Sequence, residues 1–223
     1  MSIVRFFAPY KKFGIFLFVL SVIIITLIYN ALKPKRVLRI YEPEQVNVEL
    51  VDSTMQEIRK YHKIADFKLV NQHGDTITEQ HYKDKIYVAD FFFTTCQTIC
   101  PKMTQNMGVL QQKLKNEQQV LLLSHTVMPE VDSVPQLKKY AVKKGVDKTK
   151  WNLVTGTKKE LYDLARKSYL VAKAAPFSKY DLIHTENFVL VDQKRRIRGY
   201  YDGTDTKAME QLLADIDLLL EKE

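Results

Sequence analysis

The chain has 223 residues, enough for one ordinary domain and an appendage, and its 46% hydrophobic and 27% charged residues exclude an intrinsically disordered chain. The net charge is +8, but half of this excess lies before Tyr61, where nine basic and five acidic residues accompany an apolar segment. Since no module of interleaved basic and aromatic residues goes with this charge, we expect no binding to nucleic acid.

Residues 13–29 form an almost wholly apolar run, near the lower end of the ~17–25 residues that a transmembrane helix needs. A cleaved signal peptide is the alternative, but its apolar region is usually shorter and ends at an Ala-x-Ala-like site, which this run lacks. We therefore predict a short N-terminal segment over 1–12 and a single uncleaved transmembrane anchor over 13–30. Charge does not orient the anchor, because basic residues flank it on both sides: Arg5, Lys11 and Lys12 before it, and Lys33, Lys35, Arg36 and Arg39 after it.

Residues 31–60 contain Pro34 and Pro43 and show no sustained period, so we predict a tether there and one domain over 61–223. In this domain short apolar runs alternate with helical patterns. The predicted strands are 64–70, followed by a hairpin turn at 71–75, and then 86–93, 120–123, 151–154, 188–192 and 196–201. The predicted helices are 101–114, 135–144 with Ser133 as its cap, 158–167 and 206–220. This order predicts an α/β, thioredoxin-like fold with an N-terminal β-hairpin extension.

The only two cysteines, Cys96 and Cys100, lie where a predicted central strand gives way to a helix that begins near Pro101. The free N–H groups and positive dipole end of a helix stabilise a thiolate, so we expect lowered thiol pKa values there. The phenylalanines just before the cysteines are expected in the core. Met103 and Met107 have helical spacing and are also interpreted as core residues rather than as thioether ligands.

Five histidines could supply a further ligand. His62, near the tether, and His73 and His81, in or beside polar turns, are expected on the surface. His125 ends a predicted central strand. His184 precedes the predicted strand 188–192, in the loop that passes over the helix-start cysteines in a thioredoxin-like topology. We therefore take His184 as the better candidate and His125 as the reserve.

These features together resemble the Sco/SenC family over residues 61–220. The segments that carry the resemblance are Ile64-Ala65-Asp66-Phe67, the turn at Gly74, Phe91-Phe92-Phe93-Thr94-Thr95-Cys96-Gln97-Thr98-Ile99-Cys100-Pro101, Ile183-His184-Thr185 and Leu190-Val191-Asp192. The spacing Cys-x-x-x-Cys-Pro with a later histidine is specific, since thioredoxins carry Cys-x-x-Cys. Members of this family are membrane-tethered copper proteins that assist cytochrome c oxidase assembly. The resemblance implies that Cys96, Cys100 and His184 are copper ligands, and that an oxidase subunit with its CuA site, or another copper-receiving protein, is the client.

Two positions depart from the family pattern. Ile183 stands where an aspartate usually precedes the histidine, and Met128-Pro129-Glu130 stands for Asp-Pro-Glu, although Asp132 is present. A metal-bound histidine normally donates its second ring N–H to a carboxylate or carbonyl. Asp181 or a main-chain carbonyl would therefore have to accept it here.

Two thiolates and an imidazole form a soft ligand set of low coordination number, which suits Cu(I) and can also hold Cu(II). Zinc accepts the same donors, but no base and substrate pocket for zinc catalysis is evident in the sequence. Our leading hypothesis is therefore a copper metallochaperone rather than an enzyme, bound to the cell (inner) membrane by a single span with its domain outside the cytoplasm.

Two enzymatic hypotheses remain open. A thiol–disulfide oxidoreductase would use the same cysteine pair on the cysteines of a client protein, one thiolate attacking and the other resolving. A thiol peroxidase needs a thiolate in a donor-rich pocket, which the apolar Ile99 between the cysteines and the lack of a nearby arginine disfavour.

Overall fold

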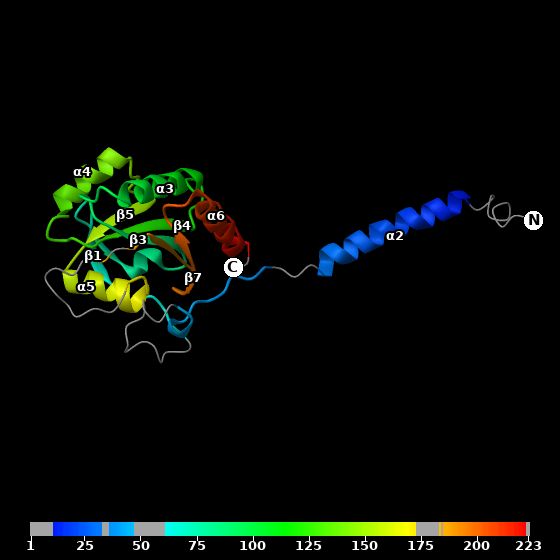
Figure 1. Ribbon diagram of the computed structural model, residues 1–223, viewed down its shortest axis with the longest axis horizontal. Coiled ribbons are helices and arrows are strands. Elements are labelled where there is room, and N and C mark those ends of the chain that lie inside the picture. The colour runs from blue at the N-terminus through cyan, green and yellow to red at the C-terminus, as the bar shows by residue number, and fades with distance from the viewer. Residues whose placement is uncertain (1–10, 33–35, 47–60, 173–182, 184, 222–223) are drawn as a thin grey trace, which may run out of the picture. The chain divides into compact units, whose positions relative to one another are not determined.

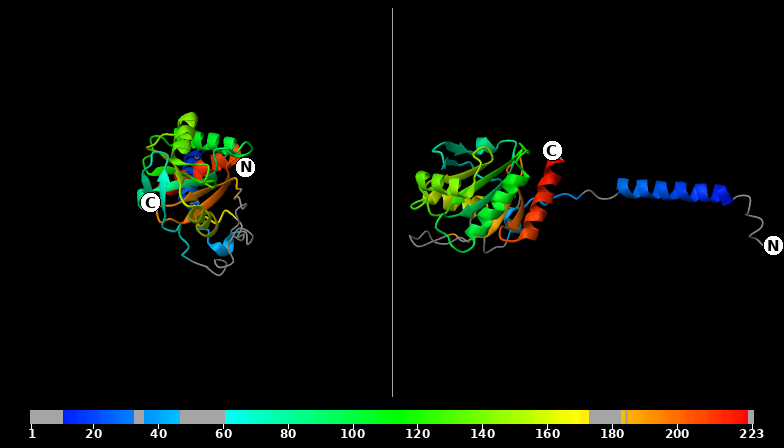
Figure 2. Two further views of the ribbon diagram at one scale, coloured as in Figure 1. Left: turned by 90° about the vertical axis from the view of Figure 1, so that its left-hand side faces the viewer. Right: turned by 90° about the horizontal axis from the view of Figure 1, so that it is seen from above.

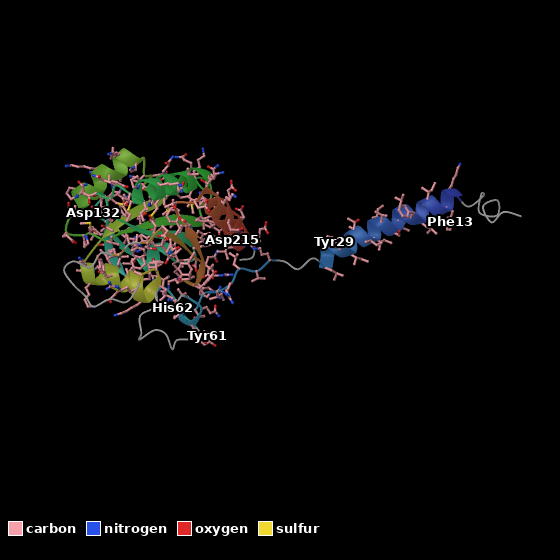
Figure 3. All side chains as sticks on the ribbon, viewed as in Figure 1. Phe13, Tyr29, Tyr61, His62, Asp132 and Asp215 are labelled. Atoms are coloured by element: carbon pink, nitrogen blue, oxygen red, sulfur yellow. The ribbon has the colours of Figure 1, made fainter. Side chains whose placement is uncertain are left out.

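The computed structural model describes residues 11–32, 36–46, 61–172, 183 and 185–221. The chain divides into two units, Met1–Val37 and Leu38–Glu223 (Figure 1). The first contains helix α2 (Lys11–Leu32), whose side chains between residues 12 and 29 are exposed. Phe13 and Tyr29, labelled in Figure 3, mark the two ends of this exposed apolar run. By length and composition, its stretch Lys12–Tyr29 could span a bilayer, as predicted from the sequence.

The second unit is built on a seven-stranded sheet with the strand order β2-β1-β5-β4-β3-β6-β7. The central strands β3, β4 and β5 are parallel, whereas β1–β2, β1–β5, β3–β6 and β6–β7 are antiparallel pairs. The strands are β1 (Lys68–Asn71), β2 (Thr76–Thr78), β3 (Ile86–Phe92), β4 (Val120–Thr126), β5 (Trp151–Thr155), β6 (Asn187–Val191) and β7 (Ile197–Asp202). This is the predicted thioredoxin-like order, with β1 and β2 as the N-terminal hairpin.

Helices cover both faces of the sheet (Figure 1). One face is covered by helices α3 (Cys100–Lys113), α4 (Val134–Lys144) and α6 (Thr206–Leu220). In the right-hand view of Figure 2, α3 (green) and α6 (red) lie on the side nearer the viewer. Helix α5 (Lys158–Asp163) and the π-helical turn η5 (Leu164–Ser168) pack on the other face. Two short 3-10 turns, η2 (Pro43–Gln45) and η4 (Glu79–Tyr82), complete the described elements.

Three elements differ from the sequence prediction by more than a single residue at either end. Strand β1 begins at Lys68 rather than at Ile64, because the Ile64 N–H donates to the Arg195 carbonyl outside the sheet. Strand β4 continues three residues further, to Thr126, because its pairing with β3 extends to the pair Phe92–Thr126. The predicted helix 158–167 is divided into α5 and η5.

Residues 38–46, here called the edge segment, belong to the folded unit although we predicted them as part of the tether. The Tyr41 N–H donates to the Ile197 carbonyl of β7 at 2.9 Å, and the Tyr41 and Tyr200 rings make an edge contact at 5.3 Å. The Arg198 guanidinium donates to the Leu38 and Arg39 carbonyls. Residues 47–60 of the predicted tether lie outside the described residues.

Alternation along β3 separates two hydrophobic cores. Val88 and Phe92 point into the core beneath α3 and α6, whereas Ala89 and Phe91 point into the core beneath α5. His125, opposite Phe91 on β4, lies on the α5 side and is fully buried. Its ring stacks on Phe91 with centroids 4.8 Å apart. Burial lowers the pKa of His125 to about 4, so its imidazole is neutral at physiological pH.

A buried neutral histidine makes folding stability depend on pH in a defined direction. In the unfolded chain His125 takes up a proton near its ordinary pKa of 6.5, which the buried ring resists until about pH 4. Relative to a His125→Phe variant, the wild type should therefore lose up to about 3 kcal/mol of unfolding free energy as the pH falls from 8 to 4. Urea unfolding of both proteins across this range measures the difference, and parallel curves would contradict a neutral buried ring.

Candidate metal centre

The two cysteines lie on the connection between β3 and α3. Strand β3 ends at Phe92 and α3 begins at Cys100, with Pro101 in its first turn. Cys96, in the intervening loop, is partly exposed, and its N–H donates to the Phe93 carbonyl at 3.3 Å. Cys100 is 4% exposed and packs in the core beneath α3 and α6. Both thiols are free, so the site combines an accessible sulfur with a buried one.

The two thiols differ in acidity. Partial burial opposes ionisation of Cys96, but hydrogen bonds from the Cys100 thiol, the Thr98 hydroxyl and the N–H groups of both residues outweigh it and lower the pKa of Cys96. The Cys96 Sγ lies 3.6 Å from the Thr98 Oγ1. Burial, with the hydrogen bond donated to Cys96, raises the pKa of Cys100 to about 12. Our expectation of lowered pKa values at the helix start is confirmed for Cys96 and wrong for Cys100, where burial dominates.

A buried carboxyl and a tyrosine lie close to this pair. Asp90, on the same face of β3 as Phe92, is almost fully buried, and burial raises its pKa to about 7. Its Oδ1 has no hydrogen-bond partner among the described residues. A charge on Asp90 would also raise the pKa of Cys100, so the two groups interact electrostatically. From α4, the Tyr140 ring packs 5.6 Å from that of Phe92, and its hydroxyl lies 2.8 Å from the Thr104 Oγ1.

Asp90 is not among the site residues expected from the sequence, because residues 86–93 otherwise form a continuous apolar run. The available signal was one charged residue inside an otherwise apolar strand, six positions before Cys96. A charged residue such as aspartate is almost never fully buried unless it is paired, so its presence in a buried strand is informative. Thr94 is not among the expected site residues either, although it hydrogen-bonds to the carboxylate of Asp132 in the cysteine loop.

The structure separates the histidine candidates. His125 lies on the opposite face of the sheet from Cys100, so it does not meet the thiols. His184, with Asp181, lies outside the described residues. His73 and His81 are exposed, as predicted. The surface prediction for His62 is wrong, because it is 6% exposed and its Nε2 lies 2.7 Å from the Ser168 carbonyl.

The remaining sequence candidates are structural. Met103 and Met107 are fully buried in the core beneath α3, which confirms their interpretation as packing residues. Ile183, at the position where an aspartate was expected, is buried in the core beneath α5. Ile183 has no side-chain acceptor, so if His184 binds a metal, its second ring N–H must donate to another group.

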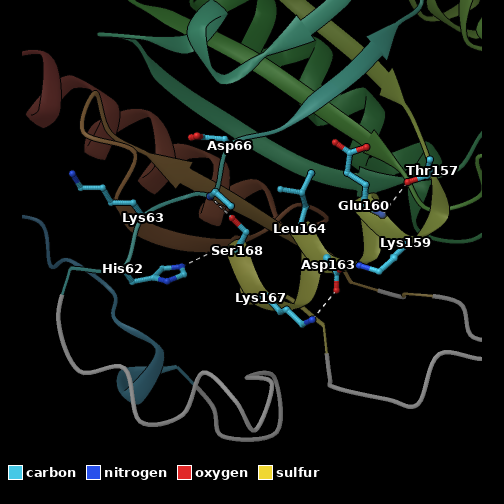
Figure 4. Close-up of a pocket in the computed structure, with 11 residues that line it drawn as sticks. His62, Lys63, Asp66, Thr157, Lys159, Glu160, Asp163, Leu164, Lys167 and Ser168 are labelled. Carbon is cyan, nitrogen blue, oxygen red and sulfur yellow. Dashed lines mark hydrogen bonds and ion pairs between the residues drawn. The ribbon is translucent and has the colours of Figure 1, made fainter.

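A separate cavity of about 610 Å³ lies between the start of the domain and α5 (Figure 4). None of its lining residues is a cysteine, and several are already paired. The Ser168 Oγ accepts from the Ala65 N–H at 2.7 Å, and Asp163 forms ion pairs with Lys159 and Lys167. This cavity therefore offers no soft donor set and is distinct from the thiol site.

Comparison with known proteins identifies the family of the chain. Residues 55–221 match the family model described as SCO1/SenC. A SCO1 protein homolog from Bacillus subtilis (strain 168) is 32% identical over 157 residues, which cover 70% of this chain and 81% of that protein.

Solved structures agree with this match. BsSco, described as a member of the Sco family of cytochrome c oxidase assembly proteins with a disulfide switch, is 30% identical with a TM-score of 0.62, covering 73% of this chain and 95% of that one. Bradyrhizobium japonicum ScoI, solved with copper bound, shares the fold at 24% identity and a TM-score of 0.57, covering 70% and 99%. The thiol site thus lies on a fold that its relatives share, and the chain belongs to the SCO1/SenC family.

Proposed function

We propose that this protein is a membrane-anchored copper carrier that binds the ion through the sulfurs of Cys96 and Cys100 and the imidazole of His184. The observation that carries this proposal is that Cys96, an accessible thiol with a lowered pKa, accepts a hydrogen bond from the buried thiol of Cys100. Both lie where strand β3 gives way to helix α3. Thiolates are soft ligands that suit Cu(I) as well as zinc, and relatives with this fold have been solved with copper bound, which favours copper here.

Copper binding on these residues releases a proton. Cys100 is protonated at neutral pH, since its pKa is about 12, and it must give up this proton to become a ligand. The apparent copper affinity should therefore rise with pH. Transfer to a client then proceeds by exchange of one thiolate ligand for another, beginning at the partly exposed Cys96.

The residues that flank His184 support its assignment. Thr185 is buried, and its Oγ1 accepts from the N–H of Asn187, the first residue of β6. Because β6 runs antiparallel to β3, Asn187 lies at the same edge of the sheet as the end of β3, from which the cysteine loop departs. The strand that follows His184 therefore begins at the sheet edge where the cysteine loop leaves β3, which favours His184 over the other histidines.

The client and the location follow from the family and the N-terminal helix. A relative at 30% identity is described as belonging to a family of cytochrome c oxidase assembly proteins, so we infer that an oxidase subunit with its CuA site receives the copper. The span Lys12–Tyr29 would hold the carrier in the cell membrane, with the domain on the extracytoplasmic side. A membrane anchor raises the effective concentration of the domain for a membrane-bound client.

Copper titration of the detergent-solubilised full chain tests the ligand set. We expect the wild type to bind one Cu(I) per chain in competition with a chromophoric chelator. The copper affinity of Cys96→Ser, Cys100→Ser and His184→Ala should fall by well over tenfold, which corresponds to about 1.4 kcal/mol. His73→Ala, at an exposed histidine in a turn, is the matched control and should bind like the wild type. Unchanged affinity in His184→Ala would eliminate the three-ligand site, whatever the two serine variants do.

A second function, thiol–disulfide exchange, is favoured by the unequal acidity of the two cysteines. The Cys96 thiolate would attack one sulfur of a client disulfide and release the other client sulfur as a thiolate, which takes a proton from solvent. Cys100 would then lose its proton and attack the Cys96 Sγ, which frees the second client thiol and leaves a Cys96–Cys100 disulfide. This reaction needs no histidine, so His184→Ala should abolish tight copper binding and retain the reduction of a disulfide-bonded test peptide.

Alkylation distinguishes the two sulfurs directly. In the reduced, copper-free full chain at pH 7, iodoacetamide should modify Cys96 well before Cys100, because only the thiolate reacts and the pKa of Cys96 is lowered while that of Cys100 is about 12. Peptide mass spectrometry over time measures both rates. Cys100→Ala removes the hydrogen bond to Cys96 and should move the pH midpoint of Cys96 alkylation upwards. Equal rates at the two cysteines would contradict this ordering.

A further inference from the structure

The carboxylate of Asp132 is fully buried between the end of β4 and the start of α4, near its label in Figure 3. It accepts four hydrogen bonds from two threonines. The Thr94 N–H donates to both of its oxygens, at 3.1 and 3.3 Å, and the Thr94 hydroxyl donates to Oδ1 at 2.5 Å. The Thr126 hydroxyl donates to Oδ2 at 2.5 Å. Hydrogen bonds to an ionised acceptor are shorter and stronger than neutral ones.

These bonds connect the cysteine loop to the end of the neighbouring strand. Thr94 lies two residues before Cys96, and Thr126 is the last residue of β4, paired with Phe92 of β3. Helix α4 adds a further contact, since the Gln136 side chain donates to the Thr94 Oγ1 at 3.0 Å. One buried carboxylate therefore holds the beginning of the loop against a rigid part of the sheet.

We propose that Asp132 is the positioning residue of the thiol site, and that it fixes the loop from Thr94 onwards so that Cys96 stays within reach of Cys100. This inference deepens the proposed copper function and rests on the same two sulfurs. The Asp132 carboxylate makes its hydrogen bonds with Thr94 and Thr126 and not with either sulfur, so it acts through Thr94. Holding the loop beforehand reduces the ordering cost that each binding event would otherwise carry.

The proposal has a consequence that does not involve copper. The equilibrium between the Cys96–Cys100 disulfide and the dithiol measures how often the two sulfurs meet. Reduction by glutathione breaks this bond with two electrons from two glutathione thiols, which leave as one glutathione disulfide. A loop released from Asp132 brings the sulfurs together less often, so its disulfide is reduced more readily.

Asp192 provides a matched control. It is also a fully buried carboxylate in a short connection, and it accepts from the Arg196 N–H and from the Arg196 and Arg198 guanidinium groups. It lies in the β6–β7 turn, at the end of the sheet opposite the thiols, because β6 runs antiparallel to β3. Loss of Asp192 therefore perturbs a buried hydrogen-bond network without touching the cysteine loop.

The test compares the full chain with Asp132→Ala, Asp132→Asn and Asp192→Ala in copper-free glutathione buffers, with the fraction of disulfide measured by mass spectrometry. We expect Asp132→Ala to shift the equilibrium towards the dithiol by roughly tenfold. Asp132→Asn should fall between Asp132→Ala and the wild type, because its carbonyl oxygen can still accept the Thr94 N–H. Asp192→Ala should stay within about twofold of the wild type, as expected for an independent site.

Several results would overturn the proposal. An Asp132→Ala equilibrium within about twofold of the wild type would do so, and so would an equal shift in Asp192→Ala, which would indicate a general loss of stability. If Asp132→Ala does not fold, Thr94→Val removes one donor to the carboxylate and should shift the equilibrium in the same direction; no shift would count against Asp132. Copper titration of the wild type and the same variants separates the two proposals. If the wild type binds no copper but Asp132→Ala still shifts the disulfide equilibrium, the positioning role is supported and copper binding is rejected.

Discussion

The parallel pairing of β3 with β4 is the interaction on which the site depends. Seven residue pairs, from Ile86–Val120 to Phe92–Thr126, align the carboxyl ends of the two strands at one edge of the sheet. The cysteine loop follows the carboxyl end of β3, and the segment that carries Asp132 follows the carboxyl end of β4. Neither loop has regular structure of its own between its strand and its helix, so their common position comes from this ladder of main-chain hydrogen bonds.

The same pairing assigns different tasks to the two faces of the sheet. On the α3 side, Asp90 and Cys100 share a core in which burial raises the pKa of both groups, to about 7 for Asp90 and to about 12 for Cys100. On the α5 side, His125 is held neutral among Phe91 and other aromatic rings. Of these four groups, only Cys96, at the edge of the sheet, is accessible and has a lowered pKa. The reactive character of the site thus comes from the contrast between one exposed sulfur and its buried surroundings.

Much of this fold could be predicted from the sequence, because apolar runs and helical stripes record which faces are buried. The cysteine turn, the hairpins and the last helix follow from that pattern. The pattern fails where polar residues are buried. Ser124, His125 and Thr126, the last three residues of β4, are polar and buried, so the predicted strand ends before them. Asp90 is likewise a buried polar residue within β3. Their burial depends on partners distant in the chain, such as the Trp151 Nε1 that donates to the Ser124 hydroxyl. Long-range partners leave no local signal.

The edge segment has a consequence for association between copies of the domain. Strand β7 lies at the border of the sheet, and an uncovered border strand offers free main-chain groups to any other extended chain. The bond from the Tyr41 N–H to Ile197, with the Arg198 contacts to the Leu38 and Arg39 carbonyls, occupies part of this border. The stretch of chain that follows helix α2 in the sequence thereby protects the domain from sheet-to-sheet association. A chain shortened to begin after this segment would lose this protection against aggregation.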